Sequence, residues 1–158
     1  MLNLGNLSQD KFTVLNRILN HSDLMKAVVY DTPNFFDKEA ILNPEDYIFD
    51  RIFPHRFIPK TSEKQKTYIT IGFGDYRPIK GGSYKSGKIT FSVFTHQDLF
   101  RTDYGMLRTD YIISEIDKLT NQSSGLGIGK TEFFKMDELS LNPDYHGSYI
   151  TYRLVEFN

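Results

Sequence analysis

The sequence predicts an α+β fold in which helices pack on a four-stranded antiparallel sheet made from two hairpins. Apolar residues recur at helical spacing near residues 15 and 112, and they alternate with a period of two in four further segments. These six segments follow the order helix, hairpin, helix, hairpin. Helices interleaved with hairpins, and not with single strands, favour α+β over a parallel α/β sheet.

The first helix is expected to begin at Ser8, whose side chain can cap it. Its apolar residues form one stripe, made of Phe12, Leu15, Ile18 and Leu19. His21-Ser22-Asp23 combines a break with a fresh cap, and a short apolar stretch, 24–29, follows it. We therefore expect a helix with a kinked continuation.

Residues 31–66 are expected to form an irregular, partly packed connector, because four prolines prevent long regular elements. After it, 67–73 and 88–93 alternate strictly between apolar and polar residues and predict an antiparallel hairpin. The tip of this hairpin, 74–87, is far longer than the usual loop of about two to five residues. Tips of that length usually have a function.

The strongest helix prediction covers 101–121, which contains no proline. Its apolar positions spread over roughly two-thirds of the circumference, which is more than one sheet can cover. Arg108 and Glu115 fall inside this arc, where a lone charge is costly without a partner. Two explanations stay open: another subunit covers this helix and pairs with both residues, or the 31–66 connector wraps over the same face. Two further strands, 130–137 and 148–157, complete the expected sheet.

Length and composition limit the function. The 158 residues suffice for a single domain, 1–158, and leave no room for a second. A formal net charge of −1 argues against a protein that coats nucleic acid through its overall charge. The absence of cysteine excludes disulfides, thiolate zinc sites and cysteine nucleophiles. No apolar run reaches the roughly 18 residues of a membrane span, and 1–7 is unlike a secretory signal, so we expect a cytosolic protein without membrane contact.

The sharpest motif, 124–131, differs from a phosphate-binding P-loop in having Ser124 in place of the first glycine. A P-loop leaves a buried strand and enters a helix, whereas this segment follows a helix and precedes a β-pattern. We therefore interpret its glycines as left-handed turn residues. The four histidines lie far apart, no G-x-S-x-G elbow is present, and Asp103, Asp110 and Asp117 are interpreted as a solvated helix stripe. We expect no enzyme activity, no cofactor and no metal site.

The hairpin tip carries a basic and aromatic cluster, because no acid lies between Asp75 and Asp98. A solvated loop, a contact with an acidic protein rim and a contact with DNA phosphates are all compatible with this pattern. Together with the two charged residues of the 101–121 helix, the cluster gives the interface candidates Tyr76, Arg77, Lys80, Tyr84, Lys85, Lys88, Arg108 and Glu115.

Four segments resemble small neck proteins of tailed bacteriophages and prophages. They are FTHQDLF at 94–100, YGMLRTD at 104–110, GIGK at 127–130 and GSYITYRLVEFN at 147–158. The resemblance to these tail-terminator and head–tail joining or completion proteins extends over 45–158. It implies an α+β subunit in a ring, commonly a hexamer, that caps the tail tube and receives the head connector. No catalytic residues come with it.

The expected function is therefore that of a structural virion protein in a ring at the head–tail junction, with the tail terminator as the first candidate. The alternatives are a head-completion or adaptor protein on the connector side, a DNA-binding accessory domain that uses the basic tip, and a nucleotide-binding domain that uses 125–131. Expected partners are further copies of the chain, the tail tube protein and the head connector or adaptor proteins, with DNA only in passing through the lumen. The expected location is the virion neck, after assembly in the host cytoplasm.

Overall fold

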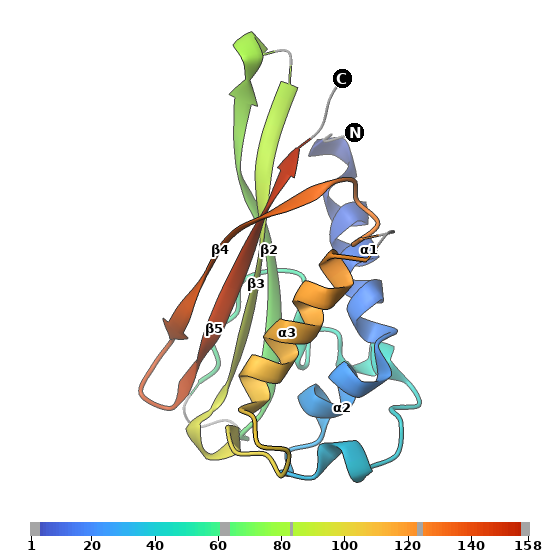
Figure 1. The fold of residues 1–158 in the computed structure, drawn as a ribbon, viewed down its shortest axis with the longest axis vertical. Helices are drawn as coiled ribbons and strands as arrows, with labels where there is room; N and C mark the ends of the chain where they lie inside the picture. Colours follow the sequence, from blue (N-terminus) through green and yellow to red (C-terminus); the bar gives the residue numbers. More distant parts are fainter. Residues whose placement is uncertain (1–3, 61–63, 83, 123–124, 156–158) are drawn as a thin grey trace.

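A computed structural model describes residues 4–60, 64–82, 84–122 and 125–155. Within these ranges it has two layers, a five-stranded sheet and three α-helices that lie on one side of the sheet (Figure 1). The helices are α1 (Leu7–Leu19), α2 (Ser22–Val29) and α3 (Arg108–Thr120). The strands are β1 (Ile52–Phe53), β2 (Thr67–Ile79), β3 (Tyr84–His96), β4 (Thr131–Ser140) and β5 (Tyr145–Val155).

The sheet is mixed, with the strand order β1-β2-β3-β5-β4. The pairs β2–β3, β3–β5 and β4–β5 are antiparallel, whereas β1 pairs in parallel with β2 through Ile52 and Phe53. The predicted four-stranded antiparallel sheet from two hairpins is therefore wrong. The additional strand is β1. It was not predicted because its two residues are too few to show a period of two, and because it lies within the proline-rich connector.

The β2–β3 hairpin projects beyond the rest of the sheet, at the top of Figure 1. Its strands continue to Ile79 and resume at Tyr84, so most of the expected 74–87 tip is paired strand. A bulge between Gly74 and Arg77 holds Asp75 at a φ of 53°. The bulge interrupts the alternation of apolar and polar residues. The sequence pattern therefore ends at the bulge, although the strand continues beyond it.

The helices follow the predicted break but differ at two starting boundaries. The first helix begins at Leu7 with Asn6 at the N-cap position and no side-chain cap hydrogen bond, so the predicted cap by Ser8 is wrong. The His21 ring accepts a hydrogen bond from the Leu24 backbone N–H at 3.2 Å and caps α2. The third helix begins at Arg108, seven residues later than the sequence predicts. Gly105 has a φ of 71° and Leu107 is extended, so the apolar spacing of 101–107 belongs to a turn and not to a helix.

The main core lies between the sheet and the helices. It contains Leu15 and Ile18 from α1, Ile71 and Phe91 from the sheet, and Ile112 from α3, among others. A second, smaller cluster is formed by Phe53, Tyr68, Phe94 and Tyr145. By alternation along the strands, this cluster lies on the sheet face that is turned away from the helices.

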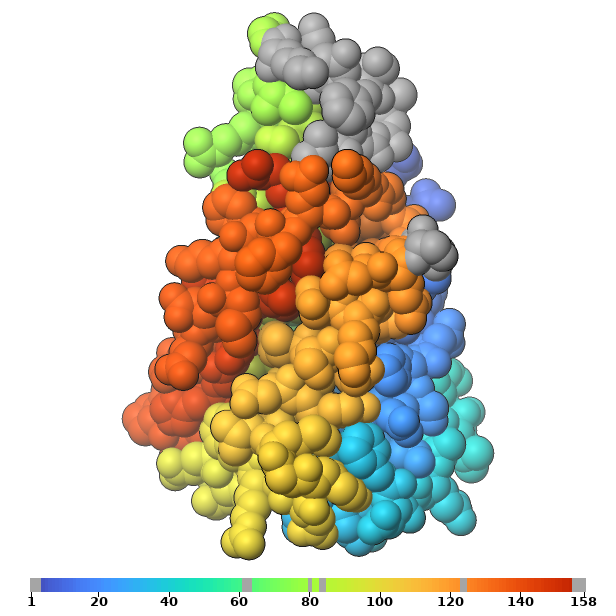
Figure 2. Space-filling model, in the orientation of Figure 1, coloured from blue at the N-terminus to red at the C-terminus, as the bar shows by residue number. Residues whose placement is uncertain are grey.

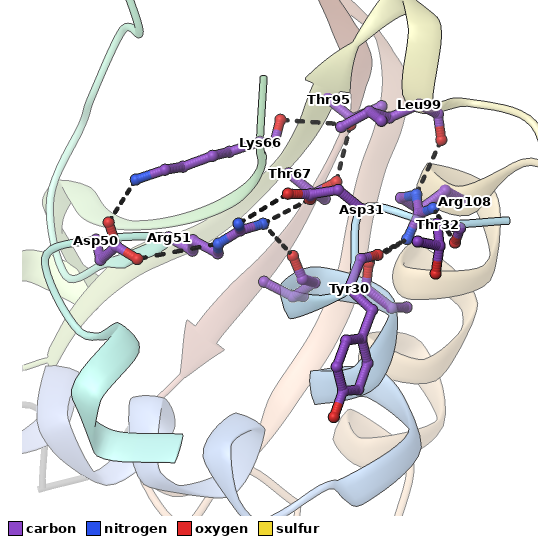
Figure 3. Close-up of polar contacts among 12 residues, drawn as sticks. Tyr30, Asp31, Thr32, Asp50, Arg51, Lys66, Thr67, Thr95, Leu99 and Arg108 are labelled. Carbon is purple, nitrogen blue, oxygen red and sulfur yellow. Dashed lines mark hydrogen bonds and ion pairs between the residues drawn. The ribbon is translucent and has the colours of Figure 1, made fainter. Parts of the chain in front are cut away.

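Arg108 is buried at the centre of a set of backbone carbonyls, with 1% of its surface exposed (Figure 3). Its guanidinium donates four hydrogen bonds of 2.7–2.8 Å to the carbonyls of Ala27, Tyr30, Thr32 and Leu99. Burial lowers the pKa of Arg108 to about 10, so the group stays charged at neutral pH. The positive charge faces the C-terminal end of α2, where the helix dipole favours a cation.

A second arginine fastens the same end of α2. Arg51 donates to both carboxylate oxygens of Asp31, at 2.8 and 2.9 Å, and to the Val28 carbonyl at 2.9 Å (Figure 3). Asp31 opens the predicted connector and Arg51 directly precedes β1. The two arginines therefore tie the connector to α2 and to the edge of the sheet, which explains how an irregular segment is held in one place.

Candidate interaction site

In the structure, the residues of the predicted basic cluster of the hairpin do not share one environment, and two of its cations are paired with a carboxylate. Asp75 accepts hydrogen bonds from Lys88 Nζ at 2.7 Å and from Arg77 Nε at 2.7 Å. These hydrogen bonds, first from Lys88 and then from Arg77, lower the pKa of Asp75 to about 2. Two of the four predicted cations thus share one carboxylate, which stands at the boundary of the acid-free stretch.

The remaining residues of the cluster have different surroundings. The Tyr76 ring lies against Gly87, where an added Cβ would come within 2.7 Å of the ring. Burial raises the pKa of Tyr76. Lys85 is exposed. The structure describes only the backbone of Lys80 and Tyr84, and Ser83 between them lies outside the described residues.

Two adjoining hollows lie on the sheet face that is turned away from the helices. The first, of about 450 Å³, is lined by Asp75, Arg77, Lys88 and Arg153 among others. The second, of about 320 Å³, shares Asp75 and Lys88 with it and extends to Arg56. Its floor is made of small residues, which include Gly72, Gly74, Thr90 and Ser92. We call this surface, with Arg56, Arg77, Lys88 and Arg153 against Asp75, the basic groove.

Sequence reasoning missed Arg153 and Arg56 as members of this site. Arg153 lies far along the chain from the hairpin, but the β3–β5 register places it directly opposite Lys88. The aromatic ring of Phe134 lies against both cations, 4.0 Å from Lys88 Nζ and 5.2 Å from the Arg153 guanidinium carbon. Only the strand pairing brings these residues together, so the spacing along the sequence held no signal for them.

Arg108 and Glu115 have their partners within the chain. The carbonyls of Tyr30 and Thr32 that bind Arg108 belong to the end of α2 and to the connector, in agreement with the second of the two explanations. Glu115 accepts from His21 Nε2 at 3.0 Å and from Lys118 Nζ at 3.1 Å. Burial acts to raise the pKa of Glu115, but the two hydrogen bonds outweigh it and lower that pKa. Neither residue needs a neighbouring subunit as a partner, so the structure gives Arg108 a place in the core and not at a surface.

Strand β4 ends the sheet and is exposed along most of its length. Three large apolar side chains are exposed there: Phe133 at 62%, Phe134 at 42% and Met136 at 43%. A long edge strand presents unpaired backbone groups on its outer side, and folded monomers usually cover or blunt such an edge. Glu132, Lys135, Asp137 and Glu138 place charges along β4, but they leave its apolar side chains open to solvent.

The other sequence motifs take structural roles. Gly125, Gly127 and Gly129 have φ values of 53°, 80° and 98°, so the interpretation of this segment as a left-handed turn is confirmed, while Ser124 lies outside the described residues. Asp117 of the predicted solvated stripe accepts a hydrogen bond from the Tyr152 hydroxyl at 2.6 Å. In the described part of the chain, no group of three His, Asp or Glu side chains could hold a metal ion. Nor does any helix among the described residues have the length and apolar character to span a membrane.

Fold and surface together define a two-layer α+β protein with a basic groove on one face of its sheet and exposed apolar side chains on the edge strand β4. The chain matches the YomW family model over residues 21–154 and belongs to that family. This is a phage-derived family of the SPbeta-like prophage kind, so the predicted bacteriophage origin is confirmed. The match runs from α2 into β5 and includes the connector and both hairpins. Neither the curated proteins nor the solved structures gave a match to the chain.

Proposed function

We propose that this phage-derived protein is a structural protein of the virion neck, where it forms a ring as the tail terminator. The observation that carries the proposal is the open β4 edge with Phe133, Phe134 and Met136 exposed. Burial of such side chains contributes about 25 cal/mol per Å², so a neighbour that covers β4 gains a substantial driving force. A protein built to assemble accounts for this edge more simply than one that acts alone.

Ring closure requires two different surfaces on each subunit, one that binds and one that is bound. The β4 edge supplies one surface, and the basic groove with the projecting hairpin supplies another. Partners in this proposal are further copies of the chain, the tail tube protein and the head connector. The preference for the tail terminator among neck proteins rests on the resemblance of 94–100, 104–110, 127–130 and 147–158 described above.

The proposal assigns no catalytic role to the buried charged residues, because these hold the fold together. Arg51 and Asp31 fasten the connector, Arg108 donates hydrogen bonds to backbone carbonyls, and His21 caps α2. A DNA-binding accessory function is the second candidate, favoured by the cations of the basic groove. The pairing of Arg77 and Lys88 with Asp75 weakens that candidate, since a carboxylate in the groove repels phosphate.

The experiment is deletion of the gene from a phage or inducible prophage that carries it, followed by electron microscopy of the particles. Loss of a tail terminator removes the cap that ends tube growth, so we expect tails of uncontrolled length that are not joined to heads. A copy of the gene supplied in trans restores normal particles. Separate heads and tails of normal length would instead favour the head-completion alternative, and normal infectious particles would contradict both.

A further inference from the structure

We infer that neighbouring copies of the chain bind each other through opposite charges, with the basic groove of one copy receiving an acidic edge of the next. The inference rests on the proposed function, a ring of identical chains, and it names the surfaces that meet. We define the acidic edge as Asp110 in the first turn of α3 together with Glu138 of β4.

The basic groove has an excess of positive charge that the chain does not neutralise. Asp75 is shared by Arg77 and Lys88. Arg153 contacts the Phe134 ring and lies opposite Glu132 in the β4–β5 register, but among the described residues it forms no ion pair with a carboxylate. The same holds for the Arg56 guanidinium. The small residues of the floor leave room above the sheet for side chains that come from outside.

The acidic edge has an excess of negative charge, which is complementary to the basic groove. A hollow of about 330 Å³ lies between the first turn of α3 and the β4–β5 pair, and its lining includes Asp110, Glu138 and the exposed Leu107. Within the described residues, neither the Asp110 nor the Glu138 carboxylate forms a hydrogen bond or an ion pair. Both α3 and β4 lie on the face shown in Figure 2, α3 in amber and β4 in orange. Unpaired carboxylates beside exposed apolar groups give this surface a charge complementary to a basic partner.

The two surfaces lie on opposite faces of the sheet. Lys88 and Arg153 alternate along their strands with Ile89 and Tyr152, which belong to the core beneath the helices, so the two cations point away from the helices. Glu138 shares its hollow with Thr109 and Asp110 of α3 and therefore lies on the helix side. A two-fold dimer through either surface would bring like charges together. A head-to-tail contact pairs opposite charges and is the type of contact that closes rings.

A second copy of the chain fits the groove better than DNA does, because each copy carries the acidic edge, whose charge is opposite to that of the groove. The formal net charge of −1 gives no general attraction to DNA. Asp75 would also face a phosphate backbone, whereas it can accept a hydrogen bond from a protein partner.

The test is a charge swap in the full-length chain, measured by sedimentation velocity over a range of concentrations. Arg153→Glu and Glu138→Arg are expected to raise the concentration of half-assembly by about tenfold or more each. The double variant restores an opposite pair and is expected to return to within about threefold of the unmodified chain. Glu45→Arg is the matched control, because Glu45 is exposed in the connector and lines neither surface.

The outcomes separate the inference from the proposed function. If the unmodified chain assembles and the single variants assemble equally well, this contact is wrong while the ring stands. If the unmodified chain stays monomeric, alone and with tail tube protein, both are wrong. If Arg153→Glu abolishes binding to a duplex oligonucleotide without changing assembly, the groove is a nucleic-acid site and the inference is overturned. Should Arg153→Glu fail to fold by circular dichroism, Arg56→Glu gives the same test from outside the strands.

Discussion

Replacement of Arg108 by methionine removes the donor of four short hydrogen bonds to backbone carbonyls in the centre of the molecule. A buried acceptor that loses its partner costs about 1–3 kcal/mol, although neighbouring losses do not add fully. Methionine keeps much of the side-chain volume, so the change tests the hydrogen bonds more than the packing. We therefore expect the free energy of unfolding to fall by about 4 kcal/mol, and by about 2 kcal/mol in Arg108→Lys, which retains the charge with fewer donors.

The assay is urea unfolding of the full chain at one fixed protein concentration, because assembly adds to apparent stability. Arg101→Met is the matched control, since Arg101 is exposed seven residues earlier, and we expect a change below about 0.5 kcal/mol there. A loss below about 1 kcal/mol in Arg108→Met would show that the carbonyls do not depend on this guanidinium, and the account of how the connector is fastened would be wrong.

Gly147→Ala is expected to destabilise the protein by about 2 kcal/mol or more, because the new Cβ would lie 1.9 Å from a carbonyl oxygen of β3. Gly72→Ala is the control, as its Cβ would meet no atom closer than 4.0 Å, and equal thermal melts of the two variants would refute the close approach. Asp75 is expected to titrate near its pKa of about 2 in a carboxyl NMR experiment, instead of near 3.8. Since the folded state lowers this pKa, the ion pair stabilises the fold above about pH 4, and its contribution is lost as the pH falls towards 2; a pKa near 4 would contradict the pairing. Tyr152→Phe is expected to lose about 1.5 kcal/mol in urea unfolding with the hydrogen bond to Asp117, and an unchanged midpoint would argue against that bond.

The fold was predictable wherever a periodic pattern reflected burial on one side. The alternation at 67–73 and 88–93 correctly indicated an antiparallel pair, and the break at His21 correctly separated two helices. The pattern failed where contacts from elsewhere in the chain decide the structure. β1 exists because Ile52 and Phe53 reach the edge of β2, and 101–107 leaves the helix because Gly105 adopts a left-handed turn.

The candidate site was only partly predictable, since it is made by pairing between strands distant in sequence. The composition of the hairpin pointed to Arg77 and Lys88, but not to the carboxylate of Asp75 between them. Arg153 joins the groove through the register of β5, which no local pattern encodes. The sequence indicated that the charge of Arg108 needs a partner. Its partners are backbone carbonyl groups, which no residue type in the sequence identifies.

The central claim is that this chain is a protomer of a ring. Its most direct test is the mass of the purified full-length protein in solution, measured by light scattering alone and with the tail tube protein of the same phage. The account predicts a discrete assembly, with six times the 18.4 kDa of one chain as the expected mass. A particle of 18.4 kDa at every concentration and with the tube protein present would contradict it.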